Sequence, residues 1–239
     1  MSNLSTFAET VVLHLDALYE RDASGLIIAM RASKQTPPRV HLVRTVEGNR
    51  WLVSALLPVA LRGVVEALLA TEPVLHTVDA MERRAPACRD ALLALLEEED
   101  NRPPANEYRG PAYVFPPVLP IPARPVEVLD APATARPHPD LTWLAEFAET
   151  DRPVVIARGD AVACCHSARR GSASAEAGLE VVSGYRRRGL AKAVTLAWAQ
   201  VTRTDGHIPL YSTSWDNEAS RANASSLGLL VYAEDWHID

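Results

Sequence analysis

The chain has 239 residues, of which 48% are hydrophobic and 23% charged, and its formal net charge is −6 at pH 7. This composition is typical of a folded globular protein and excludes a disordered chain, a fibrous repeat and a disulfide scaffold. The negative charge argues against a protein that binds nucleic acid through its overall field. With only three cysteines, no apolar run of membrane-spanning length and no signal-peptide pattern, we expect a cytoplasmic protein without a membrane partner.

The first part of the chain predicts a small α+β unit without a chemical signature. Its patterns indicate, in chain order, a helix over residues 4–20, strands over Val40–Val46 and Trp51–Leu56 joined by a turn at Glu47–Arg50, and helices over Pro58–Ala70 and Pro86–Glu98. His14 lies on the apolar face of the first helix. We expect it to pack in the core, and a ligand role is the alternative.

Prolines mark a boundary in the middle of the chain. Eleven of the eighteen prolines fall between Pro103 and Pro139, and the densest stretch is Phe115–Pro125. Such a run resists both a helix and a central strand. We therefore predict an N-terminal α+β domain over residues 1–110, a proline-rich connector over 111–125 and a second domain over 126–239.

The second domain alternates strands and helices. The predicted strands are Val126–Leu129, Pro153–Ala157, Ala161–Ser167, Ala175–Val182, Ile208–Thr213 and Leu229–Trp236, and the predicted helices are Leu141–Thr150, Leu190–Val201 and Asn217–Leu227. Hairpins next to helical crossovers predict a mixed, mostly antiparallel sheet with helices on both faces, in the α+β or mixed α/β class.

The clearest chemical signal is the loop between a strand and the longest helix. Three consecutive arginines, Arg186–Arg188, precede Gly189, Leu190 and Ala191. The first N–H groups of a helix have no internal partner, and the helix dipole adds about half a positive charge there. Because Gly189 and Ala191 are small, a phosphate could reach these amides, so the stretch predicts a pyrophosphate cradle. The alternative is a solvated basic loop with a glycine turn.

The spacing Arg186-x-x-Gly189-x-Ala191 resembles the acetyl-CoA signature, Gln/Arg-x-x-Gly-x-Gly/Ala, of the GCN5-related N-acetyltransferase (GNAT) superfamily. Residues 209–232 are similar to the strand, Asn-x-x-Ala/Ser helix and Leu-Gly-Phe-like turn that follow it, with landmarks at Asn217, Ser220, Leu227, Gly228 and Leu229. The stretch Cys164–Glu180 resembles a bacterial subgroup with an SAR…EAG element, in this chain with an extra N-terminal domain. The resemblance covers residues 126–239.

The resemblance implies a GNAT-like fold, acetyl-CoA as co-substrate without a metal, and acetyl transfer to a primary amine in a ternary complex. It implies that the strand backbone at Leu179–Ser183, freed by a bulge, holds the pantetheine arm, while the amides of Arg187–Ala191 hold the pyrophosphate. The implied cofactor contacts are Val181, Val182, Ser183, Arg186, Arg187, Arg188, Gly189, Leu190, Ala191, Asn217 and Ser220. For Asn217, a place in the first helical turn beside a capping Asp216 is an equal alternative.

Acetyl transfer needs a base, because an amine must lose its proton before it attacks the thioester. Glu176 and Glu180 lie four residues apart on one predicted strand, so both share a face with Gly178 and are the candidate catalytic residues. Plain surface glutamates are the alternative. The oxyanion would take a strand N–H near Val181 or Val182.

One departure from the family concerns the acid that protonates the leaving thiolate. Many members carry a tyrosine at the position that is Ala224 in this chain. The nearby hydroxyls are those of Ser220, Ser225, Tyr211 and Tyr232. This departure makes a non-catalytic acetyl-CoA sensor, or a scaffold with a degenerate site, the alternative to an enzyme.

Other candidate features carry less chemistry. Cys164, Cys165 and His166 lack a second ligand cluster at zinc spacing, so we expect no metal site. The acceptor is expected to be a small-molecule or peptide amine, with no nucleic-acid partner. The N-terminal domain is open to three roles, namely shaping the acceptor pocket, mediating a homodimer, or neither.

Overall fold

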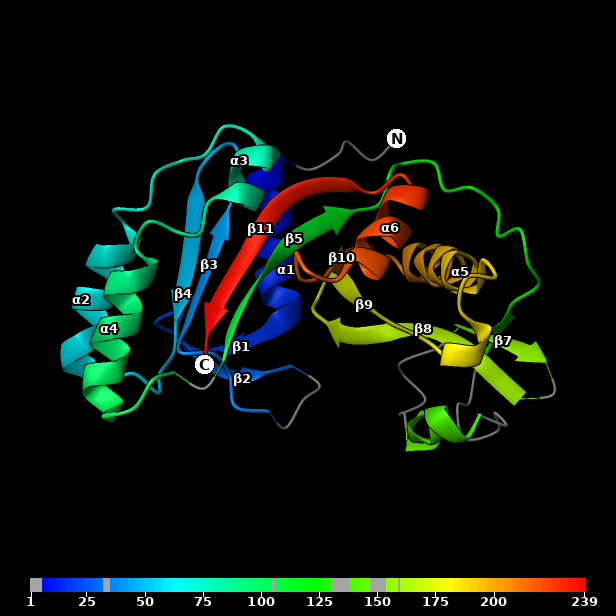
Figure 1. Cartoon of the computed structure of the whole chain (residues 1–239), viewed down its shortest axis with the longest axis horizontal. Coiled ribbons are helices and arrows are strands. Elements are labelled where there is room, and N and C mark those ends of the chain that lie inside the picture. Colours follow the sequence, from blue (N-terminus) through cyan, green and yellow to red (C-terminus); the bar gives the residue numbers. More distant parts are fainter. Residues whose placement is uncertain (1–5, 32–34, 105, 130–137, 147–153, 159) are drawn as a thin grey trace.

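The computed structural model describes residues 6–31, 35–104, 106–129, 138–146, 154–158 and 160–239. Its centre is a nine-stranded sheet with the strand order β4-β3-β11-β5-β10-β9-β8-β7-β6 (Figure 1). Every neighbouring pair is antiparallel except β9 and β10, which are parallel. The predicted mixed, mostly antiparallel sheet is confirmed.

Helices and strands alternate along the chain. The N-terminal elements are α1 (Phe7–Leu18), β1 (Tyr19–Arg21), β2 (Ile27–Met30), β3 (Val40–Arg44), β4 (Asn49–Val53), α2 (Val59–Leu69), α3 (Val78–Arg83), α4 (Arg89–Asp100) and β5 (Glu107–Val114). The following elements are β6 (Glu127–Val128), the 3₁₀ segment η2 (Pro139–Glu146), β7 (Val154–Arg158), β8 (Asp160–Arg170), β9 (Ser174–Val181), the 3₁₀ turn η4 (Ser183–Tyr185), α5 (Leu190–Thr204), β10 (Ile208–Ser212), α6 (Glu218–Ser226) and β11 (Leu230–Ile238).

Most predicted elements are present within a few residues of the expected bounds. A capping box at Thr6 begins α1, and Pro58 precedes α2 as its N-cap. The helix predicted over residues 141–150 is a 3₁₀ segment up to Glu146, and residues 147–150 lie outside the described residues. The sequence did not predict β1, β2, α3 or β5.

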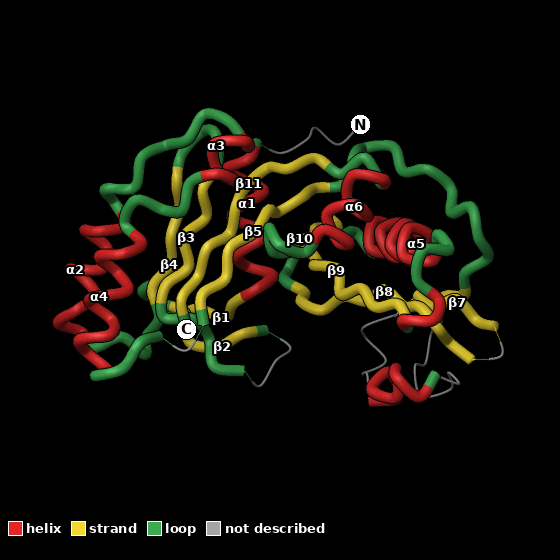
Figure 2. Tube along the Cα trace, viewed as in Figure 1, coloured by secondary structure: helices red, strands yellow, loops and turns green. Residues whose placement is uncertain are grey.

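Strand β5 crosses the boundary predicted at residue 110. It pairs with β10 on one side and with β11 on the other, and β11 pairs in turn with β3. The side chains of Trp236 and Ile238 on β11 complete the core beneath α2 and α4. The sheet and the core are therefore continuous between the N-terminal and C-terminal segments (Figure 2), and the division into two domains stays a prediction.

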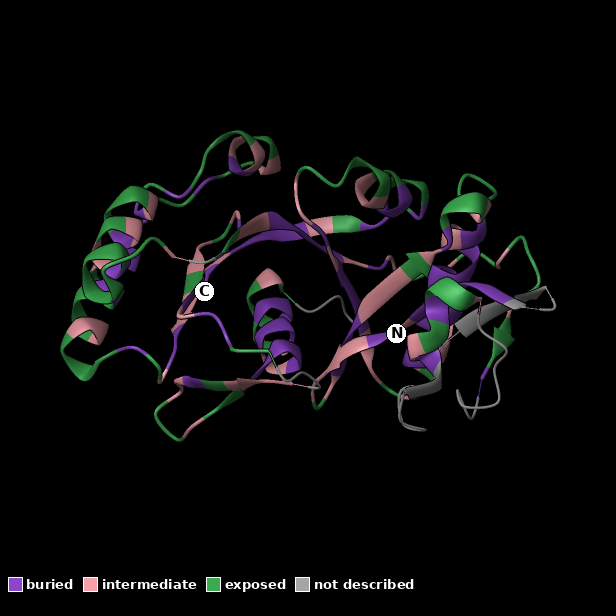
Figure 3. Cartoon of the chain, turned by 60° about the horizontal axis from the view of Figure 1, so that its bottom comes forward, coloured by how far each residue is buried: buried purple, intermediate pink, exposed green. Residues whose placement is uncertain are grey.

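The two faces of the sheet carry different helices. On β10, Leu210 packs in the core of α1, whereas the next residue, Tyr211, packs in the core of α5 and α6. Because successive strand residues point to opposite faces, α1 covers one face and α5 the other. Figure 3 shows the buried residues following the sheet and the inner sides of these helices. Among the described residues, no helix combines the length and apolarity that crossing a membrane requires.

Strands β9 and β10 separate at the centre of the sheet. Their pairing covers only Ser174–Glu176 against Ile208–Leu210. From Leu210 onward, β10 pairs with β5, while β9 continues along β8 as far as Val181. Within the described residues, the edge of β9 over residues 177–181 therefore has no strand partner on the β10 side.

Candidate active site

A cavity of about 1000 Å³ opens where β9 and β10 separate. Its walls are Ala177, Leu179, Glu180 and Val181 of β9, the basic loop and first turn of α5, the end of β10, and the exposed face of α6. This volume is at the upper end of the range typical of small-molecule and cofactor sites. The cavity thus includes both the unpaired strand edge and the start of the longest helix.

Gly189 forms the N-cap of α5 and leaves the helix start open. Its φ is 74°, in the left-handed region that favours glycine, and Arg187 also has a positive φ of 60°. A Cβ added at Gly189 would meet nothing closer than the Nε atom of Arg124, at 4.0 Å. The space in front of the first α5 amides is therefore free for an anion.

Basic side chains surround this opening unequally. Arg186, Arg187 and Lys192 line the cavity. The guanidinium of Arg188 instead lies over the Tyr185 ring, 5.1 Å from its centroid. Lys192 escaped the sequence analysis because it falls one residue after the signature, although a basic residue in the first turn was visible.

The predicted cofactor-binding residues divide into two groups, those that line the cavity and those that do not. Those that line the cavity are Val181, Arg186, Arg187, Gly189, Leu190, Ala191, Asn217 and Ser220. Val182, Ser183 and Arg188 lie outside its lining, and Val182 is buried in a separate apolar cluster on the other face. The Val182 N–H also donates to the carbonyl of Val162, at 3.0 Å. This amide is therefore not the free oxyanion donor that the sequence allowed.

The start of α6 contributes a hydroxyl pair. Asn217 itself is the N-cap of α6, and its side chain accepts the Ser220 N–H at 3.1 Å, so the cap expected at Asp216 is wrong. The Tyr211 hydroxyl lies 2.6 Å from Ser220 Oγ, and both residues line the cavity. Burial raises the pKa of Tyr211, so this phenol is protonated at neutral pH. Ala224 is fully buried, and the phenols that line the cavity are those of Tyr211 on β10 and Tyr185 of η4.

A second cavity of about 300 Å³ lies on the α1 face of the sheet. Ala177 and Ser212 line both cavities, so the two meet where β9 and β10 separate. Glu176 lines this second cavity, is 8% exposed, and accepts a hydrogen bond from Ser212 Oγ. Glu180 is exposed and lines only the larger cavity. The two candidate bases therefore have different surroundings.

The cysteine–histidine stretch on β8 is structural. Burial raises the pKa of Cys164 to about 12 and lowers that of His166 to about 4. The thiols of Cys164 and Cys165 are fully buried, and a buried protonated thiol is a poor nucleophile. Among the described residues, no group of three or more His, Cys, Asp or Glu side chains could hold a metal ion.

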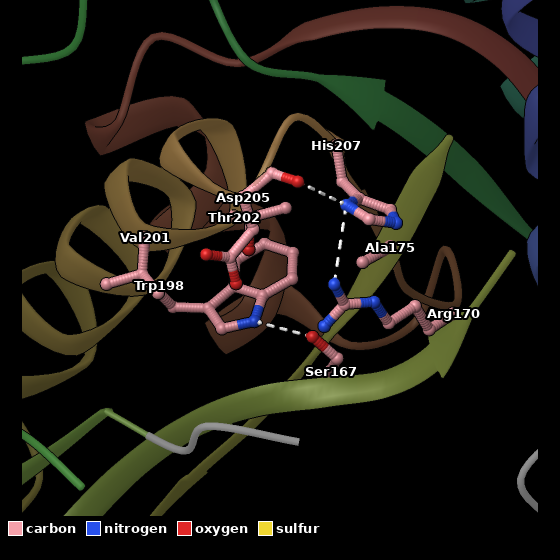
Figure 4. A pocket seen from close by; sticks show the side chains of 8 residues that line it. All are labelled: Ser167, Arg170, Ala175, Trp198, Val201, Thr202, Asp205 and His207. Atoms are coloured by element: carbon pink, nitrogen blue, oxygen red, sulfur yellow. Dashed lines mark hydrogen bonds between the residues drawn. The ribbon is translucent and has the colours of Figure 1, made fainter. Parts of the chain in front are cut away.

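A small space of about 10 Å³ beneath α5 is also structural (Figure 4). The indole N–H of Trp198 donates to Ser167 Oγ at 3.2 Å, and Arg170 Nη2 lies 3.4 Å from Nδ1 of His207. This volume is close to the minimum for a single water molecule. These contacts tie α5 to β8 and leave no room for a substrate.

Comparisons with known proteins give matches among solved structures only. No protein-family model and no curated protein sequence matches the chain. A putative GNAT acetyltransferase from Novosphingobium aromaticivorans is 18% identical, with 56% of this chain and 65% of that chain covered and a TM-score of 0.45. The aligned part is thus less than two thirds of that protein.

Two further structures cover most of the chain. A GCN5-related N-acetyltransferase-like protein from Streptococcus suis is 15% identical, with 87% of each chain covered and a TM-score of 0.48. A tandem GNAT protein from the clavulanic acid biosynthesis pathway is 14% identical, with 96% of this chain and 94% of that chain covered and a TM-score of 0.43. In fold, the chain is similar to these solved structures of GNAT and GNAT-like proteins.

Proposed function

We propose that the protein transfers an acetyl group from acetyl-CoA to a primary amine in a ternary complex. The observation that carries this proposal is the large cavity, because it joins an open helix start to an unpaired strand edge. The first feature suits a pyrophosphate and the second an extended amide-containing arm. Acetyl-CoA has both parts in one molecule.

Acetyl-CoA would lie along the cavity with its pyrophosphate at the first turn of α5. Gly189 and Ala191 leave the amides accessible, and Arg186, Arg187 and Lys192 supply positive charge. The pantetheine amides would pair with the free edge of β9 over residues 177–181. This orientation brings the thioester to the point where the two cavities meet, beside Ala177 and Ser212.

The acceptor amine would attack from the side of Glu176. Its nitrogen forms a bond to the carbonyl carbon, the carbon–sulfur bond breaks, and the amine proton passes to Glu176 directly or through Ser212. Because Val182 donates to β8, strand alternation turns the N–H groups of residues 177, 179 and 181 away from β8, and a free one beside the thioester would stabilise the oxyanion. The Tyr211 hydroxyl, which is hydrogen-bonded to Ser220 Oγ, would protonate the leaving CoA thiolate.

Thiol release from acetyl-CoA across a panel of primary amines tests this function. We expect steady turnover with some amines and a loss of about a hundredfold or more in Glu176→Gln, since general-base catalysis contributes that factor. Glu180→Gln, on the same strand but exposed, is the matched control and should retain most activity. Tight acetyl-CoA binding without thiol release for any amine would contradict the enzyme and indicate a sensor.

A further inference from the structure

The cavity on the α1 face contains a buried carboxylate with an unusual set of partners. The Asp235 side chain is only 4% exposed and lines this cavity. Its Oδ1 atom lies 3.2 Å from Nε2 of His41, and its Oδ2 atom lies 3.6 Å from Nε2 of His14. We call this cavity the acidic chamber.

Each histidine is held in turn by a tyrosine. The Tyr19 hydroxyl lies 2.6 Å from Nδ1 of His41, and the Tyr232 hydroxyl lies 2.6 Å from Nδ1 of His14. A carboxylate only accepts hydrogen bonds, so Nε2 of His41 is the donor to Asp235, whereas Nε2 of His14, at 3.6 Å, is beyond hydrogen-bond distance. The neutral His41 ring then accepts at Nδ1 from the Tyr19 phenol. Burial raises the pKa of Tyr19 and Tyr232 far above its usual range, which keeps both phenols protonated.

The hydrogen bond from His41 orients the Asp235 carboxylate. Burial lowers the pKa of His41 more than Asp235 raises it, so this ring is neutral at pH 7. Burial would raise the pKa of Asp235, but the surrounding histidines outweigh it and the pKa is lowered. An ionised carboxylate in a buried site is costly, and a cation that reaches it is bound favourably.

The charged side chains that line the chamber favour the binding of such a cation. Glu176 brings a second carboxylate, next to Ser212, and Arg169 of β8 brings one guanidinium. Beside Asp235 on the same face of the sheet, Tyr108 stacks on His237 with ring centroids 4.9 Å apart. Apart from its histidines, the lining carries the two carboxylates of Asp235 and Glu176 against the one guanidinium of Arg169.

The sheet register sets the spacing of the two carboxylate sites. Asp235 lies opposite Gly110 of β5, and Ser212 lies opposite Ala112 on the other side of the same strand. Asp235 and Ser212 are therefore two strand spacings apart across the sheet and two residues apart along it, which together make about 12 Å. One compact ammonium group cannot occupy both ends of the chamber.

We propose that the acidic chamber is the acceptor subsite and selects an amine with two positively charged nitrogens. One nitrogen loses its proton beside Glu176 and Ser212 and is acetylated, and the other stays protonated on Asp235. This inference rests on the proposed function for the reaction, but the binding of the diamine by the chamber stands on its own geometry.

Calorimetric titration of the full chain saturated with CoA tests the inference with putrescine and butylamine, which share a four-carbon chain but carry two and one amino groups. We expect putrescine to bind roughly ten- to a hundredfold more tightly, the factor that a hydrogen bond to a charged group contributes. Ornithine, which is putrescine with an added carboxylate, distinguishes a diamino acid held by Arg169 from a free diamine. Equal affinities for putrescine and butylamine would overturn the proposal.

Two variants locate the effect in the chamber. Asp235→Asn keeps the side-chain shape and should bring putrescine down to the affinity of butylamine, raising KM for putrescine with little change in acetyl-CoA affinity. Met30→Trp fills the chamber from β2 without changing its charge and should abolish putrescine binding. Full putrescine affinity in folded Met30→Trp would overturn the chamber assignment, even if Asp235→Asn failed to fold.

The same titrations separate this proposal from the proposed function. Loss of the preference for two amino groups, with acetyl-CoA binding and amine-dependent thiol release intact, would refute the chamber and leave the transferase. Absence of acetyl-CoA binding would refute the transferase, and the putrescine titration of the unliganded chain would still decide whether the chamber binds a dication.

Discussion

Three substitutions of Gly189 separate backbone strain, size and charge at the start of α5. Alanine at φ 74° costs roughly 1–2 kcal/mol of folding free energy from the left-handed backbone alone, because its Cβ meets only open space. Gly189→Gln adds an uncharged side chain where the pyrophosphate would bind. Gly189→Glu adds the same volume and a negative charge. At about 5 Å from a phosphate charge and an effective dielectric of 20, the repulsion costs about 3 kcal/mol of binding free energy.

Acetyl-CoA titration of the three variants gives the comparison. The Gly189→Glu variant should bind acetyl-CoA roughly a hundredfold more weakly than the Gly189→Gln variant. This difference in affinity should narrow at high salt, because screening weakens exposed charge pairs. Gly63→Ala is a matched control for stability, since Gly63 also has open space but lies within α2 at an ordinary φ, where alanine stabilises by roughly 1 kcal/mol. Equal acetyl-CoA affinities for the glutamate and glutamine variants would refute a phosphate site at this helix start.

Three further predictions test the catalytic acid, a buried histidine and the core. Tyr211→Phe should lower kcat in the thiol-release assay by at least about tenfold with little change in acetyl-CoA affinity, and an unchanged kcat would exclude this phenol as the acid. His166 has a pKa of about 4 in the fold against 6.5 when unfolded, so the unfolded chain binds more protons between these values and stability should fall on acidification, by up to about 3 kcal/mol at about 1.4 kcal/mol per pH unit. In denaturant titrations, the unfolding free energy of the parent relative to His166→Gln should fall by this amount between pH 6.5 and 4 and then stay constant, and a difference independent of pH would contradict the lowered pKa. Arg44 is 1% exposed and bonds the buried Glu72 and Glu234, so Arg44→Met should cost about 3–5 kcal/mol of unfolding free energy, and a loss below 1 kcal/mol would contradict the buried network.

The C-terminal elements follow closely from local sequence, whereas β5 does not. The amphipathic α5 and the signature before it are local patterns, and both lie where they were predicted. Strand β5 contains Gly110 and Pro111, which are typical of loops and edge strands. Gly110 is required because a Cβ there would lie 1.9 Å from the carbonyl oxygen of Thr213. The strand is central only because β10 and β11 pair with it, which no local pattern reveals.

In the candidate site too, the sequence reveals local features but not contacts between distant segments. The sequence identified Gly189 and its arginines, since their role depends on their neighbours in the chain. Tyr211 faces the cavity only because β10 places it against the first turn of α6. His14 does pack in the core, as expected, but its hydrogen bond to Tyr232 and its contact with Asp235 join segments more than two hundred residues apart. The acidic chamber could therefore not be predicted from sequence.

A crystal structure with acetyl-CoA bound would test the central claim most directly. The account predicts the pyrophosphate on the amides of Gly189–Ala191, the pantetheine arm along residues 177–181 of β9, and the thioester carbonyl beside Ala177 and Ser212. A cofactor bound outside the cavity between β9 and β10, or with its phosphates away from the start of α5, would contradict it.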